Sequence, residues 1–283
     1  MKTGRITLAA VACIFFQTIS PASSQDKKLV VAADVGFPPY VMKAPNGDLQ
    51  GISIDMLNYV AKKLGRNGTE VIDQEYSGII VGLNAGKYDL VISPTHVTEK
   101  RAESVLYTEP FQEANLGVLT MKDHARFNSI DDLRGVSIAV VRGSATDAFL
   151  TEREAEYKWS VVRYGKTADA VQAVLSGREA AHIAGESSVA LAAKLNDKLR
   201  KDVSLPTGLN YAWIVRQGDV ELRNKIEDAI ECMKKDGALA ASIENWFGEK
   251  PAANSIIYKP LPGYGAESFK GYDPTPHELT CGG

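Results

Sequence analysis

The order of strand-like and helix-like segments in this chain predicts an α/β fold of two lobes. Each lobe is expected to be a mostly parallel sheet flanked by helices, with a ligand cleft between the lobes. Residues 28–93 alternate short apolar runs with helical periodicity in the order β-α-β-α-β, which is typical of a parallel sheet. A segment of similar construction covers residues 136–184, and a further strand and helices follow from residue 211. The second lobe therefore interrupts the first, and the chain returns to complete the first lobe.

The first lobe opens with an apolar strand at residues 28–33, after which two adjacent prolines fix an irregular loop. An Asn-Gly-Asp turn signal at residues 46–48 predicts a hairpin-like excursion. The next apolar side chains recur with helical spacing until a glycine at residue 65 stops the helix. Two more strands are expected at residues 70–72 and 89–93, with a short helix between them.

The second lobe is predicted to follow a strand at residues 116–120 that leads out of the first lobe. Its strands are expected at residues 136–141, 160–162 and 180–184, with helices from residue 147 and at residues 168–175. A strand at residues 211–215, a long helix over residues 220–235 and a final helix ending at residue 247 then complete the first lobe. These elements place the first lobe at residues 25–119 and 207–250 and the second lobe at residues 120–206.

Residues 89–111 (DLVISPTHVTEKRAESVLYTEPF) place an arginine close to the end of a predicted strand. This strand is expected to end in a turn at Ser93 and Pro94, and Thr98 then opens a short polar helix. Arg101 should therefore lie just past the carboxyl end of the strand, where ligands bind in open α/β sheets. Its planar guanidinium can hold a carboxylate through two parallel hydrogen bonds. For the tetrapeptide TEKR taken alone, a solvated arginine in a charged turn is the alternative.

The first residues have the features of a secretory signal peptide. Lys2 and Arg5 supply a positive start, an apolar run of secretory length follows, and small residues precede a cleavage point before Gln25. The apolar run is too short for a membrane span. We therefore expect residues 1–24 to be removed and the mature protein to be soluble in the periplasm.

The mature chain is mildly acidic. Removing Lys2 and Arg5 takes the formal net charge from −3 to −5, which argues against nucleic acid or an anionic membrane as a partner. Four scattered histidines and two distant cysteines give no metal-ligand spacing, and no cofactor is expected. We expect a monomer that binds a small-molecule solute.

Two cysteines, Cys232 and Cys281, remain after processing. In an oxidising compartment such a pair favours one disulfide, which would pin the end of the chain to a helix of the body. Two unpaired thiols and a frayed terminus are the alternative. Residues 251–283 hold five of the twelve prolines and three tyrosines. This composition predicts an extended C-terminal segment that packs on the body and forms no new core.

Five stretches in a fixed order carry a resemblance to a known family. They are LVVAADVGFPPYVMKAPNGDLQGISIDMLNYVAKKLG, YSGIIVGLNAGKYDLVIS, VTEKRAESVLYTEPF, VRGSATDAFL and GDVELRNKIEDAIECMKKDGALAASIENWFG, which together cover nearly all of residues 28–248. The chain resembles the bacterial extracellular solute-binding proteins of family 3, which supply polar amino acids and related compounds to ABC importers. The resemblance implies the two-lobed periplasmic binding protein fold, a solute in the cleft, and the membrane subunits of an ABC permease as partners.

The resemblance also implies roles for residues of the first lobe. Phe37 matches an aromatic that stacks on the ligand side chain, and Tyr76 matches an aromatic on the first-lobe wall. Arg101 matches the arginine that clamps the ligand α-carboxylate. Thr95 and His96 fall in the turn that lends hydrogen-bond donors. Alternatively, Phe37 and Tyr76 could both be aromatic residues of the core.

In the second lobe, the resemblance points to the small-residue turn before a helix. Ser144, Ala145 and Thr146 match a helix N-terminus, where free N–H groups and the helix dipole favour an anion. For Thr146 taken alone, a simple N-cap is the alternative.

The chain departs from the family pattern in both lobes. Amino-acid binders of the family usually have an aspartate for the ligand ammonium at the position of Gly185, whereas here the acid is Glu186. His96 stands where serine or threonine is usual and adds a group that could titrate near neutral pH. Pro94 replaces a small polar residue and removes a backbone donor. Either Glu186 reaches the ammonium through a shifted loop, or the ligand is not a standard α-amino acid.

These features favour a binding protein without catalytic residues, which closes on a small carboxylate-bearing polar solute such as an amino acid or a derivative. The alternative is a cyclohexadienyl dehydratase-like enzyme on the same fold, which would act on prephenate or arogenate with Glu186 as general acid. A sensor module that presents its ligand to a membrane receptor is a third hypothesis.

Overall fold

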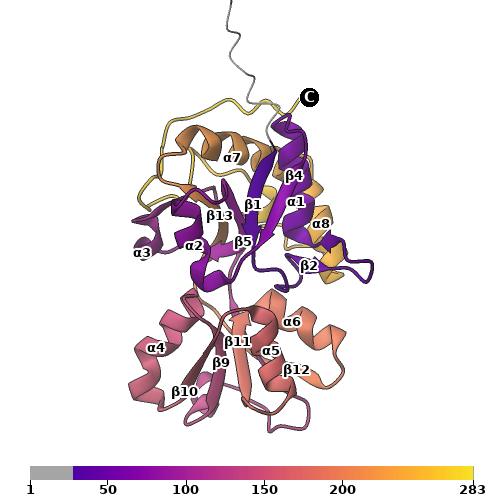
Figure 1. Cartoon of the computed structure of the whole chain (residues 1–283), viewed down its shortest axis with the longest axis vertical. Helices are drawn as coiled ribbons and strands as arrows, with labels where there is room; N and C mark the ends of the chain where they lie inside the picture. Colours follow the sequence, from indigo (N-terminus) through magenta and orange to yellow (C-terminus); the bar gives the residue numbers. More distant parts are fainter. Residues whose placement is uncertain (1–27, 283) are drawn as a thin grey trace, which may run out of the picture.

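The computed structural model describes residues 28–282 and shows an α/β protein built on two large sheets, one in the upper and one in the lower half of Figure 1. The predicted signal peptide, residues 1–24, lies outside the described residues. None of the described helices has the length and apolar character that a membrane span requires. The predicted α/β class is confirmed, with helices against both sheets.

The first sheet has the strand order β4-β1-β5-β13-β6, with β7 beside β13. Its strands are β1 (Leu29–Ala33), β4 (Thr69–Asp73), β5 (Leu90–His96), β6 (Val105–Tyr107), β7 (Gln112–Glu113) and β13 (Asn210–Arg216). β1 runs parallel to β4 and β5, whereas β13 runs antiparallel to β5, β6 and β7. The predicted hairpin forms from β2 (Met42–Lys43) and β3 (Leu49–Gln50), with Gly47 at φ +91° in its turn. Glycine suits this position because other residues rarely adopt a positive φ.

The side chains of β1 alternate between the two faces of the first sheet, as the pleat of a strand requires. Leu29, Val31 and Ala33 join one apolar cluster, which α1, α7 and α8 complete. Ala32 joins the other cluster, which α2 completes. The helices around this sheet are α1 (Ile52–Lys63), α2 (Tyr76–Asn84), α3 (Glu99–Ala102), α7 (Val220–Lys235) and α8 (Ala238–Phe247). Both faces of the sheet are therefore buried.

The second sheet has the strand order β10-β9-β11-β8-β12. Its strands are β8 (Leu116–Met121), β9 (Ser137–Val141), β10 (Ser160–Tyr164), β11 (Ala181–Gly185) and β12 (Leu199–Leu205). β9 runs parallel to β10 and β11, and β8 runs antiparallel to β11 and β12. Because β8 pairs in this sheet from Leu116 onward, the predicted lobe boundary between residues 119 and 120 falls inside a strand of the second sheet.

The second sheet is also covered on both faces. Leu150 of α4 packs in one apolar cluster, and Val174 of α5 and Val189 of α6 pack in the other. The helices are α4 (Ala145–Tyr157), α5 (Thr167–Leu175) and α6 (Glu186–Leu195), and short 3-10 turns span Ile130–Leu133 and Ile256–Tyr258. The sequence patterns do not predict α6 or β12. β12 lies at the edge of its sheet and has the sequence LRKDVSL, so it lacks the apolar run that marks a buried strand.

β5 extends beyond its predicted end. We expected a turn at Ser93 and Pro94, but the strand continues to His96. Its pairing with β13 shifts register between Ala212 and Ile214, opposite the proline. Such an irregularity accommodates a residue that has no N–H to donate to the ladder. His96, and not Ser93, is therefore the last residue of the strand.

The chain crosses between the two sheets at two segments that lie side by side. The first crossing follows β7 through residues 114–115, and the second follows β12 through residues 206–209. The backbone N–H of Ala114 donates to the carbonyl of Leu209 at 2.9 Å, which joins the two crossings. Two short adjacent connections of this kind allow the units to rotate about a hinge.

The described part of the C-terminal extension, residues 251–282, packs on the first unit beside α7 (Figure 1). Cys232 of α7 and Cys281 form a disulfide with a Cα–Cα distance of 5.3 Å, which confirms the predicted bridge. The carboxylate of Glu227 accepts hydrogen bonds from the backbone N–H of Gly265. The end of the chain is thus held to α7 by both covalent and polar contacts.

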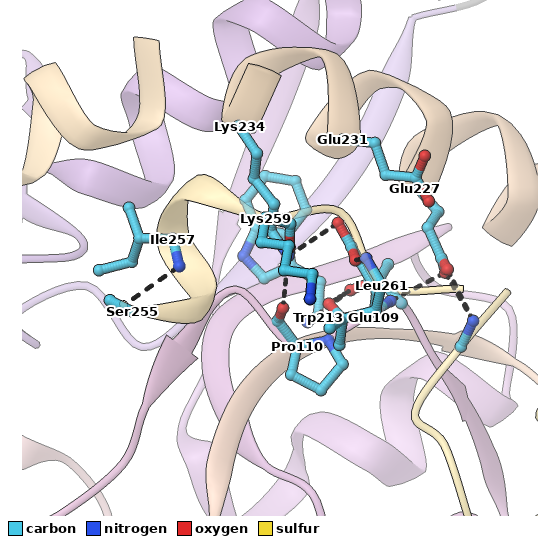
Figure 2. Close-up of polar contacts among 12 residues, drawn as sticks. Glu109, Pro110, Trp213, Glu227, Glu231, Lys234, Ser255, Ile257, Lys259 and Leu261 are labelled. Carbon is cyan, nitrogen blue, oxygen red and sulfur yellow. Dashed lines mark hydrogen bonds and ion pairs between the residues drawn. The ribbon is translucent and has the colours of Figure 1, made fainter. Parts of the chain in front are cut away.

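A buried ion pair lies beneath this extension (Figure 2). The Nζ of Lys234 lies 2.9 Å from a carboxylate oxygen of Glu109, and both side chains are buried. Lys234 also donates to the carbonyl of Pro110 at 2.8 Å. The other carboxylate oxygen of Glu109 accepts from the backbone N–H of Leu261, in the extension, at 2.8 Å. The extension therefore completes a polar network of the first unit.

Candidate ligand-binding site

A cavity lies between the two units, at the carboxyl ends of strands from both sheets. The first unit contributes Asp34, Phe37, Tyr76, Pro94, His96 and Tyr211, and the second contributes Val141, Ser144, Thr146, Thr167, Ile183, Ala184 and Gly185. Ligands of open α/β sheets bind at this edge. Five predicted site residues line the cavity together, and these are Phe37, Tyr76, His96, Ser144 and Thr146.

Two aromatic residues form part of the first-unit wall. Phe37 follows β1, and its ring centre lies 5.3 Å from that of the buried Tyr40. Tyr76 is the first residue of α2. The guanidinium carbon of Arg101 lies 5.8 Å from the centre of the Tyr76 ring, within the range of a cation–π contact. The wall therefore offers aromatic surface next to a buried cation.

His96 lines the cavity as a neutral side chain. Burial, together with the nearby Arg101, lowers the pKa of His96 to about 3. The expectation that this group titrates near neutral pH is therefore wrong, because the protonated ring would lose its hydration beside another cation. Its Nε2 is buried and has no hydrogen-bond partner among the described residues. The ring centre lies 4.6 Å from that of Tyr211, which also lines the cavity.

Arg101 lies at the boundary between the units and donates hydrogen bonds to both. Its Nη1 donates to the carbonyl of His96 at 3.1 Å, and its Nη2 donates to the carbonyl of Gly143 at 2.9 Å. The residue is 9 % exposed, which contradicts the alternative of a solvated arginine. Arg101 thus joins the end of β5 to the loop before α4, and it is not among the residues that line the cavity.

The N-terminus of α4 reaches the cavity from the second unit. Ser144 is the N-cap, and its Oγ accepts from the backbone N–H of Asp147 at 3.0 Å. Ser144 and Thr146 line the cavity, whereas Ala145 does not. Thr95 does not line it either, and its hydroxyl donates to the carbonyl of Ser93 at 3.0 Å.

The structure does not bring Glu186 to the cavity. Its carboxylate accepts hydrogen bonds from the Nζ of Lys201 and the hydroxyl of Ser204, both on β12. Burial acts to raise the pKa of Glu186, but the bonds from Lys201 and Ser204 outweigh it and lower this pKa below its usual value. The carboxylate is therefore ionised and paired outside the cavity, so the predicted contact with a ligand ammonium is not supported.

Asp34 is a cavity residue that sequence reasoning missed. It follows β1 directly, and its Oδ2 accepts from the N–H and the hydroxyl of Thr167, at 3.1 and 3.0 Å, across the gap between the units. Its Oδ1 is buried and has no hydrogen-bond partner among the described residues. The available signal was an acid at the carboxyl end of a strand, the same kind of position that pointed to Arg101.

The carboxylate of Asp34 is only partly compensated. Burial raises the pKa of Asp34 above its usual value, although the bonds from Thr167 and the charge of Lys166 act in the opposite direction. Lys166 is itself paired with Asp73, with 2.7 Å between Nζ and Oδ2. Asp34 therefore favours any ligand that brings a positive charge or a hydrogen-bond donor to its free oxygen.

Tyr211 of β13 occupies the space beside Gly185 at the end of β11. A Cβ atom added to Gly185 would lie 2.1 Å from the Tyr211 hydroxyl oxygen, so no larger residue fits there as the wall stands. The Tyr211 hydroxyl is buried and has no hydrogen-bond partner among the described residues. Sequence reasoning predicted the strand but not this approach across the cavity.

A sequence model of the bacterial extracellular solute-binding proteins, family 3, matches residues 29–249. The chain belongs to this family. The match spans both α/β units and ends as the C-terminal extension begins. Solved structures similar to this family member are amino-acid-binding proteins.

Two solved structures and one curated relative illustrate the likeness. The chain is 26% identical over 259 residues to the L-arginine-binding protein of Pseudomonas aeruginosa. The alignment covers 85% of this chain and 96% of the relative. An ancestral arginine-binding protein bound to arginine has a TM-score of 0.73 and 33% identity, covering 78% of this chain and 98% of that chain. The ancestral amino acid-binding protein AncCDT-1, a precursor of cyclohexadienyl dehydratase, has a TM-score of 0.70 and 31% identity over 78% of this chain and 95% of that chain.

Proposed function

We propose that this protein is a periplasmic binding protein that captures a small polar solute and delivers it to the permease of an ABC importer. The solute carries a carboxylate and a cationic group, as amino acids and their derivatives do. The observation that carries this proposal is the Oδ1 of Asp34, a buried carboxylate oxygen on a cavity residue with no partner among the described residues. An unpaired buried carboxylate is costly, and a ligand cation removes that cost.

The carboxylate of the solute is assigned to Arg101. A guanidinium has five N–H donors in a planar fork, and the carbonyls of His96 and Gly143 engage two of them. His96 and Tyr76 contact Arg101 and also line the cavity, and we propose that solute binding brings the other N–H donors of Arg101 to the carboxylate. Ser144 and Thr146, at the N-terminus of α4, add donors and a favourable dipole for the same anion.

Relatives support a role in solute capture. The similar proteins described above include an L-arginine-binding protein and an ancestral protein bound to arginine. A location in the periplasm agrees with the extracellular family and with the predicted signal peptide, and we propose that the protein acts there as a monomer that docks on permease subunits.

An enzyme on the same fold was the alternative hypothesis. A dehydratase needs a general acid in the cavity, and Glu186 was the predicted candidate. Because Glu186 is paired with Lys201 and its pKa is lowered, it does not support that hypothesis.

Titration calorimetry on residues 25–283 tests the proposal. We expect one solute from a panel of amino acids, ω-amino carboxylates and ω-guanidino carboxylates to bind with 1:1 stoichiometry. Asp34→Asn should weaken this binding by about 2 kcal/mol or more, roughly 30-fold, because a buried charge pair is broken. Arg101→Lys should also weaken it, because an ammonium cannot reproduce the planar fork.

The matched control is Asp48→Asn, which makes the same chemical change in the exposed turn of the β2–β3 hairpin. This variant should bind as the native protein does. Binding that survives both Asp34→Asn and Arg101→Lys would argue against the assigned site. Consumption of prephenate in a separate activity assay would favour the enzyme.

A further inference from the structure

We infer that Tyr211 is a further solute-binding residue, whose hydroxyl donates a hydrogen bond to the carboxylate of the solute. This inference rests on the proposed function and deepens it, because it gives the cavity a neutral donor that helps to set specificity. Tyr211 lies on β13, the strand that follows the second crossing between the units. The position of its hydroxyl, the lack of a protein partner and the neighbouring groups support this role.

The ring of Tyr211 is held in place by the first unit. The residue is buried, and its ring packs edge-on against the rings of Tyr40 and His96, with ring centres 5.8 and 4.6 Å away. Its backbone carbonyl accepts from the N–H of Phe111 at 2.9 Å. The hydroxyl is therefore held in a fixed position, at the cavity and beside Gly185 of the second unit.

The Tyr211 hydroxyl has no hydrogen-bond partner among the described residues, although it is buried. The two rings packed against it do not supply one. The Tyr40 hydroxyl donates to Gln112 at 3.1 Å, and the Nε2 of His96 is itself without a partner. A buried hydroxyl without a partner costs free energy. A solute that brings an acceptor into the cavity removes this cost.

The hydroxyl is a donor beside the groups to which the solute carboxylate is assigned. Burial raises the pKa of Tyr211 well above its usual value, and the charge of the nearby Arg101 acts in the opposite direction. The hydroxyl therefore keeps its proton at neutral pH. Arg101 also donates to the carbonyl of His96, the residue whose ring packs against Tyr211. A carboxylate held by Arg101 thus enters the surroundings of a hydroxyl that needs an acceptor.

Gly185 provides the room for this hydroxyl. A Cβ atom at residue 185 would lie 2.1 Å from the Tyr211 hydroxyl oxygen, which is far inside van der Waals contact. A side chain at the end of β11 and the hydroxyl of Tyr211 therefore exclude each other. In this chain the polar group that fills the space comes from the first unit.

Tyr88 offers a matched control within the first unit. It is also buried beside a glycine, and a Cβ atom added to Gly82 would lie 2.2 Å from its hydroxyl oxygen. Its hydroxyl, however, donates to the carbonyl of Ile79 at 2.5 Å, and the residue does not line the cavity. Removing the two hydroxyls should therefore have opposite consequences for stability and for affinity.

Calorimetry and thermal unfolding of residues 25–283 test this contrast. The probes are the amino acids, ω-amino carboxylates and ω-guanidino carboxylates of the panel above. We expect Tyr211→Phe to bind the solute that the native protein binds about tenfold or more weakly, with no loss of Tm in the unliganded protein, because the hydroxyl is satisfied by the solute alone. Tyr88→Phe should lose Tm and keep the native affinity.

Native affinity in Tyr211→Phe, or a loss of Tm as large as that of Tyr88→Phe, would overturn the inference. The proposed function would still stand if Asp34→Asn and Arg101→Lys weaken binding. No binding of any panel compound by the native protein would overturn both.

A double variant tests the contact between Tyr211 and Gly185. Gly185→Ala alone should weaken binding about tenfold or more, because its Cβ collides with the hydroxyl. In the Tyr211→Phe background the ring carbon lies 3.3 Å from that Cβ, so the further loss should be about threefold or less. Additive losses would overturn the inference. In a crystal structure of the complex, the Tyr211 oxygen should lie about 2.5–3.0 Å from a carboxylate oxygen of the solute, and any other partner would overturn the assignment.

Discussion

Asp34 illustrates how a single residue of the cavity can couple its own ionisation to ligand binding. One carboxylate oxygen is held by Thr167, and the other has no partner among the described residues. The charged form of this residue is therefore poorly compensated in the free protein. Binding of a cation and ionisation of Asp34 favour each other, because each supplies the charge that the other lacks.

This coupling predicts a pH-dependent affinity. The pKa of Asp34 in the free protein is raised, chiefly by burial, with Lys166 and Asp73 as its charged neighbours. The cation binds the ionised form, so affinity should fall as the pH falls through this raised pKa, by up to about tenfold per pH unit. Calorimetry between about pH 4 and pH 8 measures the slope.

Asp34→Asn is the control for that experiment, because its weaker binding should lose this part of the pH dependence. His96 does not contribute in this range, since its pKa is about 3.

The pH dependence of folding stability has the opposite sign to that of ligand affinity. A carboxyl with a raised pKa in the folded state makes the unliganded protein less stable as the pH rises through that pKa. An affinity that improves on acidification would contradict the assignment of the cation to Asp34.

At the scale of elements, α7 carries a buried charge, Lys234, which lies beneath the C-terminal extension. Lys234 and Glu109 are both buried, and burial raises the pKa of Glu109 to about 7 even with Lys234 beside it. Lys234→Met should lower the free energy of unfolding by about 3 kcal/mol or more, because it leaves Glu109 buried without its partner. Urea denaturation at pH 8 measures this loss. At that pH the unpaired Glu109 is destabilising in either form, because it must remain a buried charge or take up a proton from solvent.

Lys225→Met is the matched control on the same helix. Its ion pair with Glu221 is exposed, so we expect no measurable change in stability. The double variant Lys234→Met/Glu109→Gln should recover part of the loss, because it removes the unpaired charge. Equal stability of the Lys234→Met and Lys225→Met variants would show that the buried pair contributes nothing.

The disulfide should stabilise the same region. Cys232 and Cys281 are 49 residues apart, so their bridge restricts a long loop of the unfolded chain. Replacing both by alanine should lower the free energy of unfolding by about 2–4 kcal/mol. It should also make residues 251–283 sensitive to limited proteolysis. A double variant as stable and as resistant as the native protein would mean that polar contacts alone hold the extension.

The sequence predicts elements well where apolar periodicity and turn residues agree. The long helix expected at residues 220–235 has these bounds in the structure, and the hairpin forms at its predicted turn. β12 is missed because it lies at the edge of its sheet, where polar residues replace the apolar run that marks a buried strand. That omission also hides the partner of Glu186, because Lys201 lies on β12.

The cavity residues are less predictable than the elements that hold them. Phe37, Tyr76 and His96 reach the cavity as the family resemblance implies. Asp34 and Tyr211 were missed because their roles depend on contacts across the gap, with Thr167 and Gly185. No local pattern encodes which loop of the second unit faces a given strand end of the first.

At the scale of the whole molecule, polar contacts across the gap join the two units and favour their closed arrangement. Asp34 with Thr167, Arg101 with Gly143, Gln112 with Ser187, and Lys166 with Asp73 all join the two units. The paired crossings at residues 114–115 and 206–209 provide the hinge (Figure 1). A solute that bridges Asp34 and Arg101 adds to the contacts already made, so binding should favour the closed arrangement.

The Lys166–Asp73 bridge allows this closure to be tested apart from the ligand contacts. Neither residue lines the cavity, and their charged groups are 2.7 Å apart in a partly exposed position. The double variant Lys166→Met/Asp73→Asn removes the bridge and leaves the summed charge beside Asp34 unchanged. Because such a pair contributes about 0–1 kcal/mol, we expect the closed population to fall and the Kd to rise by up to about fivefold.

Small-angle X-ray scattering of the unliganded variant should give a larger radius of gyration than that of the native protein, and saturating ligand should remove the difference. High salt should weaken binding to the native protein more than to the variant, because salt screens the bridge that the variant lacks. If the variant matched the native protein in scattering, in Kd and in salt dependence, the bridge would have no part in closure. The cross-gap contacts of Asp34 and Arg101 would then be the ones that couple closure to the ligand.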